Sequence, residues 1–307
     1  MEVIFLGTSS GVPTKNRNVS SIVVRYQGDY IFIDVGEGTQ RQAMLSGVGL
    51  RKNIKIFITH MHGDHVLGLI PMIQTMCMMN RKEPLYIYGP RGIKEFLRDN
   101  MKILKINPTF KVNIEYLGNN KTFEFENYLV RTIKNNHDRY SYSISIEEKP
   151  RPGKFNPELA IRDKIPVTFW KTLKSGKNIV INGKVIDYRK YVSPPYLGRK
   201  VVISGDTRPF EGLIRLAKNA DVLIHEATFA SDKKERSIET KHSTAEEAAI
   251  IAKKANVKIL IITHFSARYE DVEVLVNEAR KIFPATFAAN DFMRIEIPPS
   301  KRQLKSS

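Results

Sequence analysis

The chain has 307 residues, 42% of them hydrophobic, so it is long enough to bury the core of one large domain or two small ones. No stretch approaches the roughly 18 to 20 uninterrupted apolar residues of a membrane span, and the first residues lack the basic region of a signal peptide, so we expect a cytoplasmic protein with no membrane partner. Cys77 is the only cysteine, which excludes an intramolecular disulfide and a thiolate metal cage. A metal ion would have to be held by His, Asp and Glu side chains.

Positive charge is large and unevenly distributed along the chain. Lys and Arg outnumber Asp and Glu by 49 to 32, a formal net charge of +17, which favours a polyanionic partner without identifying it. Residues 149–200 hold 13 Lys and Arg against 3 Asp and Glu, an excess of 10 that is over half of the total. Prolines and glycines also interrupt this stretch. We therefore expect residues 149–200 to be an insertion that stands off the core of a single domain spanning residues 1–307.

Short runs of β-branched residues recur and predict buried strands. In chain order these runs are Val3–Leu6, Ile22–Tyr26, Tyr30–Ile33, Ile54–Thr59, Val201–Ser204, Val222–Ile224 and Ile259–Thr263. Helical patterns follow, because Ser243 to Glu247 is typical of a capped helix start that continues to Ala255, and Asp271 to Phe283 gives another helix. Strands that alternate with helices predict a layered α/β fold.

A dense group of potential metal ligands comes directly after the predicted strand at residues 54–59. Its sequence is His60-Met61-His62-Gly63-Asp64-His65. Imidazoles and a carboxylate crowded this closely lose solvation and repel one another when protonated, whereas a divalent zinc ion turns the crowding into coordination bonds. The alternative is a polar loop with scattered histidines, which would not explain why so many potential ligands lie within six residues.

Further candidate ligands stand at or after the carboxyl ends of other predicted strands. They are His137, Asp206, His225 and His264. Because the carboxyl ends of strands converge on one edge of an α/β sheet, where such folds place their sites, we expect these side chains to gather at one place. Any one of these histidines alone would more often be a satisfied structural residue, but their shared context favours a common site.

The pattern His-x-His-x-Asp-His after a strand resembles the signature of metallo-β-lactamase-fold hydrolases, whose architecture is a four-layer αββα sandwich. The resemblance implies two zinc ions per subunit, held by His60, His62 and His137 for the first, by Asp64, His65 and His264 for the second, and by Asp206 between them. A bridging zinc hydroxide would be the nucleophile, because two zinc ions lower the pKa of a shared water and stabilise both oxygens of an in-line displacement. Asp34 is expected to brace the ligand histidines from behind.

Proton transfer requires residues beyond the metal ligands. By analogy, Asp64 would also act as the base that accepts a proton from the attacking water. In phosphodiester cleavage the leaving alkoxide needs a proton, and His242, just before a predicted helix and outside the implied ligand set, is the candidate general acid. Glu226 would orient His242 and raise its pKa so that it carries a proton near pH 7. On its own, Glu226 is equally compatible with a surface carboxylate at a strand end.

Metal ligands predict hydrolysis but not the substrate, since this fold hosts lactamases, glyoxalases, sulfatases and nucleases alike. Over essentially its full length the chain resembles ribonuclease Z, the family of tRNA 3′-processing endonucleases. The motifs that carry this resemblance are Gly7–Pro13, His225–Thr228, His242–Thr244 and Ala289–Phe292. The resemblance to this family therefore implies that the substrate is a precursor tRNA.

Two further segments have counterparts in that family. Residues 13–18 match its Pro-x-Lys-x-Arg-Asn loop, which takes part in recognising the tRNA 3′ end. By this resemblance Lys15 and Arg17 would bind phosphate or base edges and Asn18 would read a base, although an ordinary exposed basic turn is the alternative. Residues 149–200 occupy the place of a flexible arm that clamps the tRNA body. Residues 164–169 depart from its usual Gly-Pro-rich segment, but a charge clamp depends on net charge and reach.

The resulting prediction is a zinc-dependent endoribonuclease that removes the 3′ trailer from precursor tRNA and leaves a tRNA 3′-hydroxyl and a 5′-phosphate on the trailer. The resemblance also implies a homodimer, in which one subunit's arm holds the tRNA that the other subunit cuts. A small-molecule phosphodiesterase or arylsulfatase is one alternative, but it would have no use for the basic arm or the loop at residues 13–18. An RNA-binding factor with a structural metal site is the other, and it would need neither His242 nor two complete ligand sets.

Overall fold

A computed structural model describes residues 1–51 and 53–303, which form two compact units. The larger unit contains residues 1–146 and 200–297, and the smaller unit contains residues 147–199 together with the segment that starts at Pro298. No helix in this described part of the chain combines the length and the apolar character that crossing a membrane requires.

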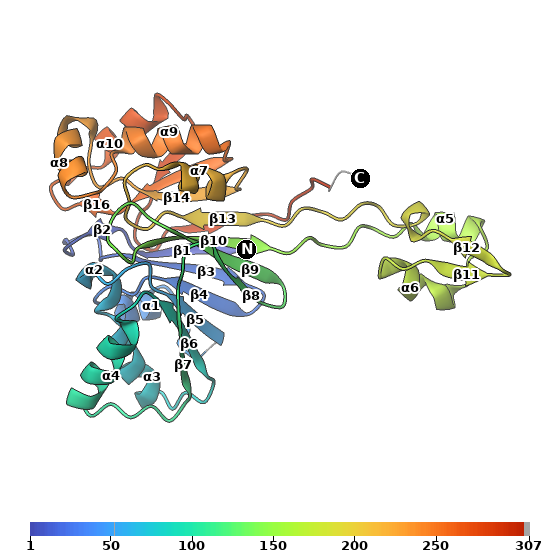
Figure 1. The fold of residues 1–307 in the computed structure, drawn as a ribbon, viewed down its shortest axis with the longest axis horizontal. Coiled ribbons are helices and arrows are strands. Elements are labelled where there is room, and N and C mark those ends of the chain that lie inside the picture. The colour runs from blue at the N-terminus through green and yellow to red at the C-terminus, as the bar shows by residue number, and fades with distance from the viewer. Residues whose placement is uncertain (52, 304–307) are drawn as a thin grey trace. The chain divides into compact units, whose positions relative to one another are not determined.

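The larger unit is built on two sheets, each with seven strands among the described residues (Figure 1). The first sheet contains, in spatial order, β18 (Arg294–Glu296), β1 (Glu2–Gly7), β3 (Ser21–Tyr26), β4 (Asp29–Ile33), β5 (Asn53–Phe57), β6 (Leu85–Gly89) and β7 (Val112–Tyr116). The second contains β17 (Thr286–Ala288), β15 (Ile259–Thr263), β14 (Val222–Glu226), β13 (Lys200–Ile203), β10 (Tyr142–Glu148), β9 (Tyr128–Lys134) and β8 (Lys121–Glu124). Each sheet has a parallel part, β4 to β7 in the first and β13, β14, β15 and β17 in the second.

Three apolar clusters hold these sheets and their helices in four layers. Side chains such as Phe5 on β1 and Ile144 on β10 join the inner faces of the two sheets. The outer face of the first sheet packs against α1 (Thr39–Leu45), α3 (Leu69–Met78) and α4 (Ile93–Ile103). The outer face of the second packs against α7 (Glu211–Ala217), α9 (Ala245–Ala255) and α10 (Glu273–Arg280). Since burying one such side chain contributes roughly 1.5–3 kcal/mol, these clusters dominate stability. The αββα layering confirms the predicted fold class.

The predicted strands are present, with one informative difference at the site. The run predicted to extend to Thr59 leaves the sheet at Phe57, where β5 ends. The reason is that the backbone N–H of Thr59 donates to Oδ1 of Asp34 at 2.7 Å and not to a neighbouring strand of the same sheet. The chain is thereby released from the sheet just before the ligand histidines begin.

The helix predicted after Ser243 starts as its sequence indicates. Thr244 caps α9, accepting from the backbone N–H of Glu247, while the Glu247 carboxylate accepts from the backbone N–H of Thr244. Such a reciprocal cap satisfies two of the backbone donors that a helix start leaves without partners. The second predicted helix is shorter than expected, because α10 begins at Glu273, whose N–H is taken by the Asp271 side chain.

The smaller unit has its own small core. It contains α5 (Pro157–Arg162), α6 (Trp170–Lys174) and the hairpin β11 (Ile179–Ile181) with β12 (Lys184–Ile186), packed around Ala160, Ile165, Leu173, Ile179 and Tyr191. At its base Arg199 and Glu148 form a buried two-pronged ion pair at 2.7 and 3.0 Å. The segment after Pro298 joins this unit through the N–H of Leu197, which donates to the carbonyl of Arg302.

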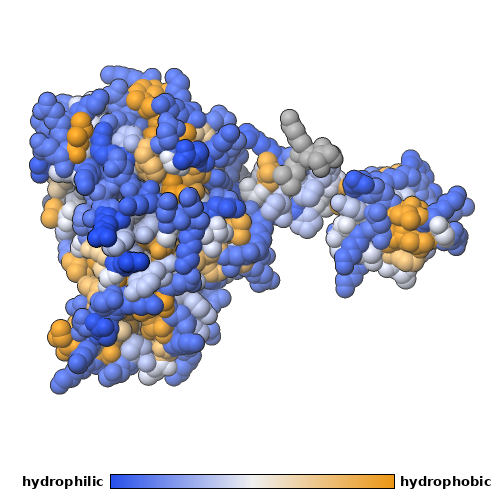
Figure 2. All heavy atoms as spheres, viewed as in Figure 1, coloured by the Kyte–Doolittle hydropathy of each residue, from blue (hydrophilic) through white to orange (hydrophobic). Residues whose placement is uncertain are grey.

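The surface of the smaller unit carries both hydrophilic and hydrophobic side chains, as Figure 2 shows. The exposed apolar residues of this unit include Ile161, Val167, Val180 and Val185.

Short elements of the larger unit include α2 (Gly63–Val66), α8 (Lys234–Glu239), and the two-residue strands β2 (Ser9–Ser10) and β16 (Phe265–Ser266), which pair with each other.

Candidate metal centre and active site

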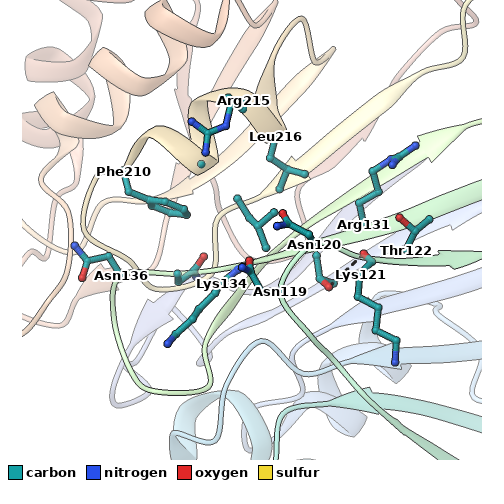
Figure 3. A pocket seen from close by; sticks show the side chains of 14 residues that line it. Asn119, Asn120, Lys121, Thr122, Arg131, Lys134, Asn136, Phe210, Arg215 and Leu216 are labelled. Carbon is teal, nitrogen blue, oxygen red and sulfur yellow. Dashed lines mark hydrogen bonds between the residues drawn. The ribbon is translucent and has the colours of Figure 1, made fainter.

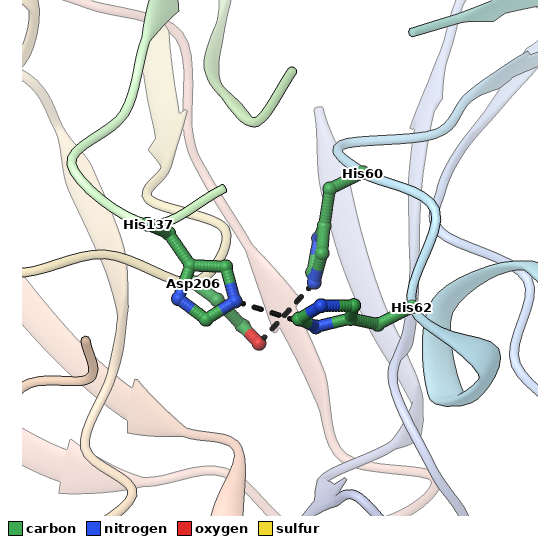
Figure 4. Close-up of side chains that lie close together, drawn as sticks. All are labelled: His60, His62, His137 and Asp206. Carbon is green, nitrogen blue, oxygen red and sulfur yellow. Dashed lines mark hydrogen bonds and ion pairs between the residues drawn. The ribbon is translucent and has the colours of Figure 1, made fainter. Parts of the chain in front are cut away.

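The first predicted ligand group gathers at one point in the structure. His60 and His62 follow β5, His137 follows β9 and Asp206 follows β13, and Figure 4 shows the four side chains pointing toward one another. Each offers a ligand atom within 4.8 Å of the others. Nε2 of His137 lies 3.3 Å from Nδ1 of His62, and Nε2 of His60 lies 3.6 Å from Oδ2 of Asp206.

The second predicted group lies directly beside the first. Asp64 and His65 belong to α2 and His264 follows β15, and their ligand atoms also lie within 4.8 Å of one another. Oδ2 of Asp206 is 3.3 Å from Nε2 of His65 and 3.4 Å from Nε2 of His264. Asp206 therefore faces both groups, as a bridging ligand would.

Buried hydrogen bonds orient the ligand histidines. Nδ1 of His65 donates to Oδ2 of Asp34 at 2.7 Å, as expected from the sequence, and Nδ1 of His137 donates to the carbonyl of Lys241 at 2.9 Å. Nδ1 of His60 contacts the Thr59 hydroxyl at 3.0 Å. Because the Thr59 hydroxyl already donates to Asp34, it accepts from His60. Bonds of this kind leave Nε2 of each ring with a free lone pair for a metal ion.

A hydrogen bond also orients His264, which follows β15 of the second sheet. Its Nδ1 lies 2.9 Å from the hydroxyl of Thr228, which itself donates to Oε2 of Glu226 at 2.8 Å. The backbone of His264 is in the left-handed region, with φ 60°. A histidine rarely adopts this conformation, and such strain persists only where surrounding structure imposes it, often at functional sites.

The chemistry of this cluster fits divalent cations. Nε2 of His60 is buried and has no hydrogen-bond partner among the described residues. A buried polar atom left in this way costs about 1–3 kcal/mol, which a coordination bond would offset. Burial and the neighbouring His65 also lower the pKa of His60 well below its usual range, so His60 is neutral, the form that binds metal. Nitrogen and carboxylate ligands without thiolates suit zinc, and other transition metals as well.

His225 is the predicted strand-end histidine that does not join the cluster. It is fully buried in β14, and its Nδ1 lies 2.6 Å from the carbonyl of Glu226. It belongs to none of the ligand groups found among the described residues. The period of two along a strand explains this, because His225 and Glu226 point to opposite faces and only one of them can face the site.

Glu226 and His242 form a pair at the edge of the cluster. Nδ1 of His242 lies 3.0 Å from Oε1 of Glu226 and 3.9 Å from Oδ2 of Asp206. Burial alone would lower the pKa of His242, but the charge of Glu226 and the hydrogen bond to it raise this pKa to about 9. Burial opposes ionisation of Glu226, yet the His242 charge lowers its pKa. The two side chains therefore form an imidazolium–carboxylate pair.

His242 is also close enough to Asp206 and His264 to be considered as a metal ligand. Its Nδ1, however, is engaged by Glu226, whose second oxygen is held by the N–H and hydroxyl of Thr228. This rigid carboxylate favours a proton-carrying role for His242.

The loop at residues 13–18 is only partly free to contact a substrate. Lys15 is exposed. The guanidinium of Arg17 instead donates to the hydroxyl of Thr8 at 2.7 Å and to the carbonyl of Ala289 at 2.8 Å, and the Asn18 amide donates to the carbonyl of Glu37 at 2.8 Å. Arg17 and Asn18 thus hold the loop against the fold.

The sequence did not reveal what anchors this loop. Asp291 accepts from the hydroxyl of Thr8 at 2.8 Å, from the backbone N–H of Asn18 at 2.7 Å and from the Gln42 amide at 3.0 Å. Burial raises the pKa of Asp291. The only signal for it was its place in the motif at residues 289–292. The segment just before the loop reaches the cluster, because the N–H of Gly11 donates to Oδ2 of Asp64 at 2.8 Å.

Several relatives that match this chain over nearly its full length are named ribonuclease Z. Ribonuclease Z of Nitrosopumilus maritimus is 42% identical over 298 residues, covering 97% of this chain and 100% of the relative. The chain belongs to the ribonuclease Z family. Ribonuclease Z of Methanosarcina mazei is 41% identical, covering 97% of this chain and 98% of the relative, and that of Bacillus subtilis is 37% identical, covering 97% and 99%.

The chain is also similar to solved structures and to two family profiles. The human tRNase Z short form has a TM-score of 0.70 and 29% identity, covering 97% of this chain and 100% of that structure. The metallo-β-lactamase-fold protein YhfI of Bacillus subtilis, at 18% identity and TM-score 0.70, covering 96% of this chain and 99% of that structure, shows the fold alone. Residues 1–151 match the profile of the anti-Pycsar protein Apyc1, and residues 182–265 match that of the beta-lactamase superfamily domain.

These comparisons confirm the predicted family and fold. They also confirm the predicted class of enzyme, a tRNA 3′-processing endoribonuclease. Dependence on a metal ion follows from the fold together with the His and Asp clusters.

Proposed function

We propose that this ribonuclease Z hydrolyses the phosphodiester that joins the tRNA body to its 3′ trailer, leaving a 3′-hydroxyl on the tRNA and a 5′-phosphate on the trailer. One observation carries the mechanism: two groups of ligand side chains meet at Asp206, with the His242–Glu226 pair beside them. A structural metal site would need no such pair, which speaks against a purely RNA-binding factor.

Zinc is the proposed metal, with two ions per subunit. His60, His62 and His137 would hold one ion, Asp64, His65 and His264 the other, and Asp206 both. When bound, such a pair of ions supplies Lewis acidity, which lowers the pKa of water and stabilises negative charge on the oxygens of a phosphodiester.

His242 is the proposed general acid. It stands beside Asp206, and the buried Glu226 carboxylate keeps it protonated, so it can deliver a proton to the departing 3′ oxygen of the tRNA. This protonation is needed because an alkoxide is a poor leaving group in neutral water.

Asp64 is the proposed base, in addition to its role as a ligand. Burial opposes its ionisation, but the neighbouring His65 and the hydrogen bonds from His264 and His65 lower its pKa. Asp64 therefore stays ionised, which is the form that can bind a metal ion and accept a proton. The N–H of Gly11 fixes the orientation of its Oδ2.

Recognition of the tRNA 3′ end is assigned to the loop at residues 13–18. Lys15 is exposed and can reach a phosphate. Arg17 and Asn18 shape the loop, and direct contact of either side chain with RNA would require it to release an intramolecular partner.

The smaller unit, which includes the basic residues 149–199, is proposed to bind the tRNA body. Its many exposed Lys side chains and its own small core support this role. Attraction of phosphates depends on the net charge of the unit and not on the Gly-Pro-rich segment from which residues 164–169 depart. A homodimer and a cytoplasmic location are part of the proposal and are supported by the family resemblance. Light scattering coupled to size exclusion would measure the mass of the assembly.

The proposal is tested with a 5′-labelled precursor tRNA that carries a 3′ trailer. The chelated enzyme should be inactive, and added zinc should restore a single cut at the end of the tRNA body that leaves a 3′-hydroxyl. An intact precursor beside rapid hydrolysis of a small aryl phosphodiester would reject the proposal in favour of a small-molecule phosphodiesterase.

A further inference from the structure

An open pocket of about 550 Å³ lies in the larger unit, between the β8–β9 hairpin and the start of α7 (Figure 3). We call it the β9/α7 pocket, and its walls are residues 119–122 and 131–136 together with Phe210, Gly212, Arg215 and Leu216. It is separate from the loop at residues 13–18, and none of the ribonuclease Z motifs described above includes any of its lining residues.

Cations and amides line the β9/α7 pocket. Four of its side chains, Lys121, Arg131, Lys134 and Arg215, are basic, and the described lining includes no Asp or Glu. Lys121 is paired with Glu115 at 2.9 Å. Lys134 and Arg215, by contrast, are exposed and have no ion-pair partner among the residues that the structure describes. The pocket therefore offers unneutralised positive charge at the ends of two flexible side chains.

One end of the pocket adjoins the metal-ligand cluster. Asn136 lines the pocket and directly precedes the ligand His137. The amide of Asn135 donates to the backbone carbonyl of Asp206 at 3.0 Å, and the N–H of Arg208 donates to the carbonyl of Asn136. From Lys134 back to Arg131 the wall follows β9, a distance of roughly 10 Å at about 3.4 Å per residue. The pocket is thus a basic path that leads away from the cluster.

This path and the loop at residues 13–18 adjoin different ligand groups. Gly11, two residues before the loop, contacts Asp64 in the second group, whereas the pocket borders His137 in the first group and Asp206, which faces both. A strand cut at the cluster needs one exit for the RNA on each side of the scissile phosphate. If the loop holds the tRNA 3′ end, the pocket is left for the other side.

We propose that the β9/α7 pocket binds the single-stranded 3′ trailer of the precursor, with Lys134 and Arg215 contacting its phosphates and the Phe210 ring available to stack a base. The inference rests on the proposed function. Basic grooves with an aromatic platform bind single strands without strong sequence preference, so the pocket would accept trailers of many sequences.

The test compares two precursors of the same tRNA, one with a single-nucleotide trailer and one with a trailer of about six nucleotides. The double variant Lys134→Gln, Arg215→Gln should lower the ratio of kcat/KM for the long trailer to that for the short one by about fivefold to tenfold, through KM. In the double variant, the slope of log KM for the long trailer against log salt concentration should decrease by about 1.4, since each single-strand phosphate contact accounts for roughly 0.7.

The matched control is Lys253→Gln, Lys254→Gln, which removes two exposed charges from α9, outside the pocket. It should leave the ratio at the wild-type value. An unchanged ratio in the pocket variant would overturn the inference, and so would equal losses on both precursors, which would place another part of the RNA in the pocket. Failure of the proposed function looks different, because then the wild-type enzyme with zinc would cut neither precursor.

Discussion

Nδ1 of His242 lies 3.0 Å from Oε1 of Glu226, and this contact joins a histidine before α9 to the last residue of β14. The Glu226 carboxylate is buried and is held by the backbone N–H of Thr207 at 3.0 Å as well as by Thr228. It therefore cannot move away when His242 changes its protonation state. The charge state of His242 is thus set by a fixed negative neighbour.

Replacing Glu226 by Gln should move the alkaline limb of the pH profile. Glu226 raises the pKa of His242 to about 9, so removing its charge lowers that pKa, and the acid form is lost at a lower pH. Bound cations lower the pKa in both proteins, so the comparison isolates Glu226. We expect the apparent pKa of the alkaline limb, in the profile of kcat against pH, to decrease by about one unit or more. The value of kcat at pH 6 should change much less. A Glu239→Gln control on α8 should keep the wild-type limb, and an unmoved limb in the Glu226 variant would contradict the assignment.

Removing the imidazole itself should separate proton transfer from metal binding. In His242→Ala, kcat for precursor tRNA should fall by about 10² to 10⁴, the usual contribution of a general acid. The zinc content, measured by mass spectrometry of metals, should stay at the wild-type value because His242 is outside the proposed ligand set. Loss of one zinc ion together with the activity would instead make His242 a ligand.

Asp206 should couple the metal ions to stability. Ions that bind the folded chain at about a hundredfold excess over their Kd stabilise it by roughly 2.7 kcal/mol, so chelation should lower the Tm of the wild type and zinc should restore it. Asp206→Asn removes the carboxylate that faces both ligand groups, at 3.3 Å from His65 and 3.6 Å from His60. We expect its Tm to respond only weakly to zinc. A full zinc response, followed by calorimetry, would argue against a bridging role.

The loop at residues 13–18 gives a matched pair of variants. Arg17→Met removes hydrogen bonds to Thr8, Ala289 and Asn290, and should cost about 1–3 kcal/mol of unfolding free energy. Lys15→Met should change stability by less than about 0.5 kcal/mol, because Lys15 is exposed, yet raise KM for precursor tRNA. Urea unfolding and steady-state kinetics measure both effects. A KM increase without destabilisation in Arg17→Met would show that Arg17 contacts the RNA directly.

The charge of the smaller unit should matter for tRNA and not for small substrates. Lys171→Gln, Lys177→Gln removes two exposed cations from this unit. We expect KM for precursor tRNA to rise. The slope of log KM against log salt concentration should decrease by about 1.8, at roughly 0.9 per duplex phosphate contact. Hydrolysis of a small aryl phosphodiester should be unaffected. Equal KM values for tRNA in variant and wild type would reject the clamp.

Features that depend on short stretches of chain could be predicted from the amino-acid sequence. The crowding of His60 to His65 after a strand predicted a metal ion, and β-branched runs and the cap at Thr244 predicted the approximate starts of several strands and of α9. The family followed from such local motifs as well. These features can be recognised in a sequence because ligand spacing, capping and strand periodicity each involve only a few residues.

The positions of distant side chains relative to one another are seen only in the folded chain. Asp206 faces both ligand groups and Glu226 reaches His242, as the resemblance implied. It was not expected that His225 stays outside the cluster or that Arg17 donates to Ala289 across the fold. No periodicity encodes these contacts, because each depends on how two sheets and their loops pack. The β9/α7 pocket has the same origin, since its cations come from separate elements and become a single basic path only when the chain is folded.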